Sequence, residues 1–195
     1  MKKIVPLLLF ATVFSCNNKE ETPKASGFIS VRSLIEAQVA HVDTSLYPII
    51  RITYVDSNHY DTTYIPREKF REEARDFLAI PDLADPKIAK RYREDPVQYD
   101  EMLNRVIITY KPVDIEKEEI KKQELLVTPA SATGDKVNNI LISREINTRD
   151  SFLKQEMLWI MDRRFQIITT RQKAGLPEQM TITRVIWNED PLDKE

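Results

Sequence analysis

The chain contains very little glycine: three residues in 195, at positions 27, 134 and 175. Loops that bind phosphate groups need glycine where the backbone approaches the ligand, and isolated glycines do not form such a loop. The sequence accordingly has no P-loop and no dinucleotide-binding fingerprint, and it also lacks the Gly-x-Ser-x-Gly elbow of serine hydrolases. Nothing in it predicts a cofactor.

The chain also lacks an excess of charge of one sign. Lys and Arg number 29 against 31 Asp and Glu, which leaves a formal net charge of −2. A protein that binds nucleic acid through its phosphates carries a basic patch and usually a basic domain. We therefore expect no nucleic-acid partner.

Long apolar runs are absent, and cysteine occurs once, as Cys16. The longest apolar stretch, residues 4–14, is eleven residues long, whereas a membrane-spanning helix needs roughly 20. It follows Lys2 and Lys3 and precedes the small residue Ser15, and this order of regions is typical of a secretory signal. We expect residues 1–15 to be a leader and not a membrane anchor.

The leader ends in a motif that resembles a lipobox. In Val13-Phe14-Ser15-Cys16 the cysteine follows a small residue, although Phe14 is bulkier than the residue most lipoboxes carry there. The resemblance to bacterial lipoproteins implies that Cys16 receives acyl chains such as palmitate, becomes the mature N-terminus and anchors the protein in a membrane. The alternative is an ordinary signal peptide that happens to meet a cysteine. If Cys16 is lipidated, no cysteine remains for a disulfide or a thiolate metal site.

Residues 16–27 have the composition of a flexible tether, because Ala25 is the only aliphatic residue among them. Asn17 stands where retention at the inner membrane, by resemblance to enteric lipoproteins, would need aspartate. Lys19-Glu20-Glu21 resembles the tether of surface-exported lipoproteins, and a solvated linker is the alternative explanation. We expect the protein on the outer membrane, facing the periplasm or the cell surface.

Residues 28–190 are predicted to form a single α+β domain, and 191–195 a disordered tail. Apolar residues at three-to-four spacing predict a helix over about 30–43 and a second over about 66–79. Between these helices, the β-branched segments 49–55 and 59–65 flank a polar turn and predict a hairpin. Proline at 81, 86 and 96 limits the next stretch to an irregular crossover with at most a short helix near 87–92.

The rest of the domain is predicted to be strand. Residues 151–161 fit either a helix or a strand, and we favour a strand because strands flank them. We expect an antiparallel, curled sheet with the N-terminal helices packed against it. The expected strands are 105–110, 124–128, 139–143, 151–161, 165–170 and 180–187.

The two histidines, His41 and His59, lack the spacing of a zinc motif. Carboxylate pairs such as Glu72 and Glu73 are sequence neighbours, which do not face one another on a helix or a strand. We predict no metal site and no catalytic residues.

Basic residues gather in the last predicted hairpin: Arg163, Arg164, Arg171 and Arg184. If its loop is 174–177, Arg171 and Arg184 lie on the same face as Phe165, Ile167 and Ile182. A cationic edge beside an apolar face would suit an anionic amphiphile or a partner protein. The alternative is that these arginines extend over the rim of a core face.

The sequence therefore favours a membrane-anchored envelope lipoprotein that binds a protein partner or an amphiphilic ligand without catalysis. The alternative is an anchored hydrolase that uses carboxylates and a histidine at the mouth of the sheet. This hydrolase would need His41 or His59 to converge with carboxylates in one pocket.

We predict that Cys16→Ala abolishes membrane anchoring and leaves the domain folded, because the lipid site precedes the first predicted core residue. The measurement is labelling of cells with a clickable fatty acid, followed by membrane fractionation. Equal label and equal membrane retention in the variant would exclude lipidation of Cys16.

Overall fold

The computed structural model describes residues 27–44, 47–54, 59–129 and 134–188. The expected leader, Cys16, the tether up to residue 26 and the expected tail lie outside the described residues. So do residues 55–58, which include the polar turn of the first hairpin.

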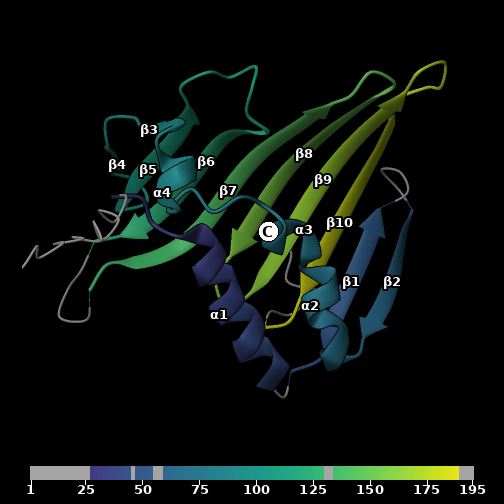
Figure 1. Cartoon of the computed structure of the whole chain (residues 1–195). Helices are drawn as coiled ribbons and strands as arrows, with labels where there is room; N and C mark the ends of the chain where they lie inside the picture. The colour runs from purple at the N-terminus through teal and green to yellow at the C-terminus, as the bar shows by residue number, and fades with distance from the viewer. Residues whose placement is uncertain (1–26, 45–46, 55–58, 130–133, 189–195) are drawn as a thin grey trace, which may run out of the picture.

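The described part of the chain is dominated by one antiparallel sheet of ten strands (Figure 1). The strand order is β2-β1-β10-β9-β8-β7-β6-β5-β3, with β4 paired to β5, so the sheet is open and ends at β2 and β3. The antiparallel, sheet-dominated architecture predicted from the sequence is confirmed. The strands are β1 (Ile49–Tyr54), β2 (Tyr60–Ile65), β3 (Tyr92–Glu94), β4 (Gln98–Asp100), β5 (Arg105–Pro112), β6 (Ile120–Thr128), β7 (Lys136–Asn147), β8 (Ser151–Ile160), β9 (Arg164–Lys173) and β10 (Gln179–Ile186).

The helical segments are few and short, apart from the first. They are α1 (Val31–Thr44), the 3₁₀ turn η1 (Arg67–Lys69), α2 (Phe70–Glu73), α3 (Arg75–Leu78) and α4 (Pro86–Ala89). The ambiguous segment 151–161 is strand β8, as favoured. Figure 1 shows α1, α2 and α3 lying across one face of the sheet, called here the helix face.

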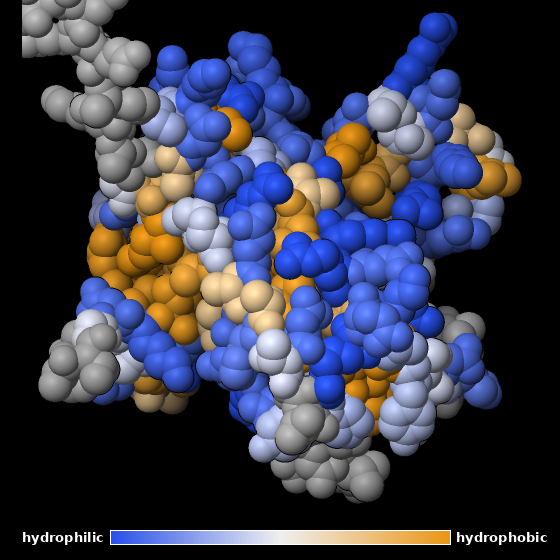
Figure 2. Space-filling model, turned by 60° about the horizontal axis from the view of Figure 1, so that its bottom comes forward, coloured by the Kyte–Doolittle hydropathy of each residue, from blue (hydrophilic) through white to orange (hydrophobic). Residues whose placement is uncertain are grey.

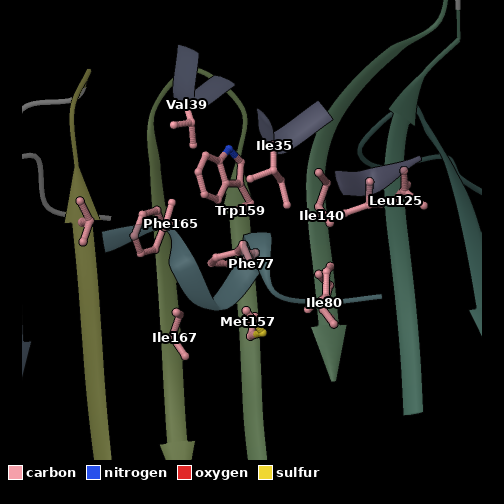
Figure 3. Packing of buried hydrophobic residues seen from close by; sticks show 14 of the residues in the cluster. Ile35, Val39, Phe77, Ile80, Leu125, Ile140, Met157, Trp159, Phe165 and Ile167 are labelled. Atoms are coloured by element: carbon pink, nitrogen blue, oxygen red, sulfur yellow. The ribbon is translucent and has the colours of Figure 1, made fainter. Parts of the chain in front are cut away.

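A single large core fills the space between the helices and the helix face. Helix α1 contributes Val31, Ile35, Val39 and Val42, whose spacing of three to four residues places them on one side of the helix. Alternate residues of the strands meet them, as Figure 3 shows for Ile140, Met157, Trp159 and Phe165. At the centre the rings of Trp159 and Phe165 stack with centroids 5.0 Å apart, and Phe77 packs edge-on against both.

The second predicted helix forms in pieces. Its buried residues Phe70, Ala74 and Phe77 share one face, as the periodicity indicates. The backbone at Ala74, with ψ 2°, leaves α-helical geometry, and the Phe77 N–H bonds to the Ala74 carbonyl three residues back. Tight i to i+3 bonding of this kind interrupts an α-helix.

The first described residues of the chain pack against strand β5. The Phe28 ring stacks on Tyr110 with centroids 4.5 Å apart, and the Ile29 N–H donates to the Tyr110 hydroxyl over 3.2 Å. Burial raises the pKa of Tyr110, whereas the hydrogen bond from Ile29, which its oxygen accepts, acts in the opposite direction. The first described residues are therefore fastened to the sheet.

The opposite face of the sheet, called here the open face, carries a smaller apolar cluster than the helix face. Ile50, Ile52 and Ile186 form a separate buried cluster with Tyr54 packed against it. Figure 2, in which the bottom of the molecule as drawn in Figure 1 comes forward, shows apolar patches among hydrophilic side chains. Among the described residues, no helix combines the length and the apolar character needed to cross a membrane.

The register of the last hairpin differs from the expected one by one residue. Phe165 pairs with Val185, and Arg171 pairs with Gln179, whereas a loop of 174–177 would have shifted these pairs. The turn spans residues 174–178 between the two strands, with Gly175 at φ 76° and the Leu176 N–H bonded to the Lys173 carbonyl. Since a one-residue shift moves a strand's side chains to the other face, Ile182 lies on the open face and is only partly buried.

We predict that Phe165→Ala lowers the free energy of unfolding by about 3–5 kcal/mol, because Phe165 is buried on the helix face and its removal leaves a cavity. Ile182→Ala, on the neighbouring strand and the other face, should cost less than about 1.5 kcal/mol. Urea denaturation of both variants measures the difference. A larger loss for Ile182→Ala would contradict the register described above.

Candidate functional site

A cavity of about 310 Å³ lies on the helix face, where the short helices α2 and α3 meet strands β1, β9 and β10. Its lining combines two apolar side chains, three threonines and five charged side chains. These residues are Phe165, Ile167, Thr53, Thr169, Thr183, Arg51, Arg75, Glu72, Glu73 and Asp76.

The cavity forms because the sheet extends beyond the helices. In Figure 1 strands β7–β10 continue past α3, which leaves their upper part uncovered. Along β9 the helix-face residues change from buried Phe165 and Ile167 to partly exposed Thr169 and exposed Arg171. The sequence thus turns polar on this face where helix cover stops.

An ion pair joins the two walls of the cavity. The Arg51 guanidinium of β1 donates from Nη1 to both carboxylate oxygens of Glu73 on α2, over 3.0 and 3.3 Å. The side chains are 36% and 17% exposed, so the pair is partly shielded from water. Charged groups held in this way are stronger than exposed surface pairs and fix α2 against the sheet.

A chain of hydrogen bonds connects Asp76 of the cavity lining to strands β8 and β7. Gln155 of β8, which is buried, donates from Nε2 to Asp76 Oδ2 over 3.0 Å. Arg144 of β7 donates to Gln155 Oε1 over 3.4 Å and to Glu119 Oε2 over 2.8 and 2.9 Å. Each buried polar group of this chain thus has a partner, which is what a core edge next to water requires.

The remaining charged groups at the rim are more exposed. Arg75 lies 3.9 Å from Asp76 with its side chain 77% exposed, and Glu72 pairs with Lys69 at 3.2 Å. The rim therefore presents both signs of charge, with threonine hydroxyls between them and an apolar floor. Such a site can hold a ligand through hydrogen bonds and opposite charges at once.

The four predicted arginines are not brought together. Arg184 and Arg164 occupy open-face positions, whereas Arg171 is on the helix face and Arg163 lies in the turn between β8 and β9. Arg171 shares the helix face with Phe165, as expected, but the expectation for Arg184 is wrong, because the hairpin register differs by one residue. Arg184 bonds to Gln166 over 2.9 and 3.1 Å and lies 5.9 Å from the Tyr54 ring centroid.

Neither histidine lies in the cavity lining. His41 is exposed near the end of α1, and His59 is exposed at the start of the β2 segment. Within the described residues, no three His, Cys, Asp or Glu side chains gather closely enough to hold a metal ion. The convergence that a histidine-dependent hydrolase needs is not found in the described part of the chain.

The sequence singled out Glu72 and Glu73 as a carboxylate pair and Phe165 and Ile167 as part of an apolar face, and it did not single out the other lining residues. In the sequence, Thr53 and Thr183 are ordinary strand residues. The pairing of β1 with β10 places them directly opposite each other. The available signal was the change from apolar to polar residues along one face of β9.

Comparison with protein-family models, curated proteins and solved structures gives no match to the chain.

We predict that Asp76→Ala lowers the free energy of unfolding by about 1–3 kcal/mol, because the buried Gln155 amide loses its acceptor. Glu72→Ala, at an exposed neighbouring position, should change it by no more than about 0.5 kcal/mol. Denaturant titration measures both. In Asp76→Ala/Gln155→Leu part of the loss should return, and strict additivity of the two single changes would contradict this coupling.

Proposed function

We propose that the protein is a lipid-anchored envelope protein that binds an amphiphilic ligand without catalysis. The observation that carries the binding half of the proposal is the cavity of about 310 Å³ with an apolar floor and a rim of both charges. The resemblance of residues 13–16 to a lipobox carries the anchoring half.

The size and the lining of the cavity indicate which part of a ligand enters it. Ligand sites usually measure about 300–1,000 Å³, so this cavity suits a head group or a short chain segment. A simple anion would meet Glu72, Glu73 and Asp76 as well as the two arginines. A zwitterionic head group satisfies both signs of charge at the rim, and the start of an attached chain can contact the apolar floor formed by Phe165 and Ile167.

The alternative of an anchored hydrolase has less support. The carboxylate of Glu73 is bound by Arg51, and that of Asp76 accepts from Gln155. General acid or base catalysis needs a carboxylate or histidine placed on the reacting group. These two carboxylates already fix the wall of the cavity.

A binding protein of this kind needs to stay near its membrane, which the proposed anchor provides. A tether from Cys16 to Gly27 spans at most about 40 Å when extended. We place the protein on the outer membrane, facing the periplasm or the cell surface, with no role in nucleic-acid binding. We also assign it to the α+β class, as a curled sheet with N-terminal helices packed on one face.

The binding proposal is tested by filling the cavity. Full-length protein, extracted from membranes in mild detergent, is examined by native mass spectrometry with added zwitterionic lysophosphatidylethanolamine and with laurate as the anionic comparison. We expect saturable binding of the lysophospholipid and weaker binding of laurate. Thr183→Phe should weaken lysophospholipid binding by about tenfold, which corresponds to about 1.4 kcal/mol.

The matched control is Thr181→Phe, an exposed position two residues earlier on the same face of β10. It adds the same ring outside the cavity and should leave binding within about twofold of wild type. Absence of saturable lysophospholipid binding, or equal binding by Thr183→Phe and wild type, would refute the cavity as the ligand site.

A further inference from the structure

Strand β2 forms one edge of the sheet, and its sequence does little to prevent further pairing. Within the described residues it pairs with β1 alone, and all of Tyr60–Tyr64 is exposed. Natural edge strands are usually very short, or carry lysine, proline or a bulge. β2 is six residues long, pairs with β1 in unbroken register and contains neither lysine nor proline, and its one charged side chain is Asp61.

The opposite edge is built differently. β3 and β4 are three residues each, and Asp95 and Pro96 interrupt the chain between them. β3 carries Arg93 and Glu94 at its exposed positions. That edge has the devices that discourage pairing, so the lack of them in β2 is specific to one side of the sheet.

We propose that β2 pairs antiparallel with β2 of a second copy of this chain, across a twofold axis at Thr62, to join two sheets edge to edge. An isologous contact of this kind requires a segment complementary to its own reverse. Tyr60-Asp61-Thr62-Thr63-Tyr64 has this property: each Tyr60 faces the other copy's Tyr64, and each Asp61 faces a Thr63 hydroxyl.

The alternative registers are poorer. An axis at Thr63 would place Asp61 opposite the apolar Ile65 of the other copy. With the axis at Thr62, no charge meets a like charge, and the tyrosines form cross-strand aromatic pairs, which stabilise sheets. Tyr60 already packs near Tyr54 of β1, with ring centroids 6.0 Å apart, so a row of rings would continue across the axis.

Two exposed tyrosines support a second copy of this chain as the partner of β2. Tyr60 and Tyr64 are 62% and 74% exposed, and both belong to the open face through their pairing with Tyr54 and Ile50. Large exposed aromatic groups at a regular spacing are typical of interface residues. The proposal does not rest on the ligand site or on lipidation.

The first test uses disulfide trapping in the full-length chain. Residues directly opposite in an antiparallel pair have Cα atoms about 4.5–5.5 Å apart, within disulfide range. Thr62→Cys should give a cross-linked dimer on mild oxidation of intact cells, whereas Glu94→Cys, on the other edge strand, should not. The wild-type chain measures any cross-link through Cys16. A Thr62→Cys chain that cross-links no more than Glu94→Cys would overturn the proposal.

The second test uses the symmetry of position 62, where the side chains of the two copies face each other across the proposed axis. The full-length protein in detergent should sediment as a dimer, and Thr62→Lys and Thr62→Asp should each sediment as monomers, because like charges then meet at the axis. Mixing the two variants should restore a dimer containing one of each, which also shows that both are folded. A monomeric wild-type protein, or no recovery on mixing, would overturn the proposal.

Discussion

The pairing of Phe165 with Val185 decides which side chains of the C-terminal half reach the helices. Through this register Phe165, Ile167 and Val185 point to α1–α3, while Ile168, Ile182 and Arg184 point to the open face. The helices pack on the resulting layer, and the cavity forms where that layer changes from apolar to threonine. A shift of β10 by one residue would move Thr183 and Val185 to the open face and bring Ile182 and Arg184 to the helix face.

Local patterns were sufficient to predict most of the elements. The period-two segments between 105 and 187 are strands, and the three-to-four spacing of Val31, Ile35, Val39 and Val42 matches the buried side of α1. The face of Ile182 was predicted wrongly, because it depends on the turn after Lys173 and not on the strand itself. That turn spans residues 174–178 with Gly175 at φ 76°, and the pattern of a strand does not determine the conformation of its loop.

The candidate site was harder to foresee, because its residues come from five elements that only the tertiary structure joins. Asp76 and Gln155 are far apart in the sequence, and neither belongs to a motif, yet they share a hydrogen bond beside the cavity. The arginines of the last hairpin were visible as a charge cluster in the sequence, and the structure distributes them over two faces and a turn. Proximity in sequence predicted the wrong grouping, and the decline of apolar character along β9, a signal for the right region, was not used.

The pairing of β1 with β10 joins the beginning of the domain to its end. Strand β1 therefore has no partner on that side until the last strand has been made, and α2, which is held to β1 by the Arg51–Glu73 pair, stays without its floor. Contacts between distant segments carry a large loop-closure entropy and slow folding. A chain of this topology completes its core only after synthesis of β10, so every shorter nascent chain leaves the apolar side of α1–α3 without its full cover.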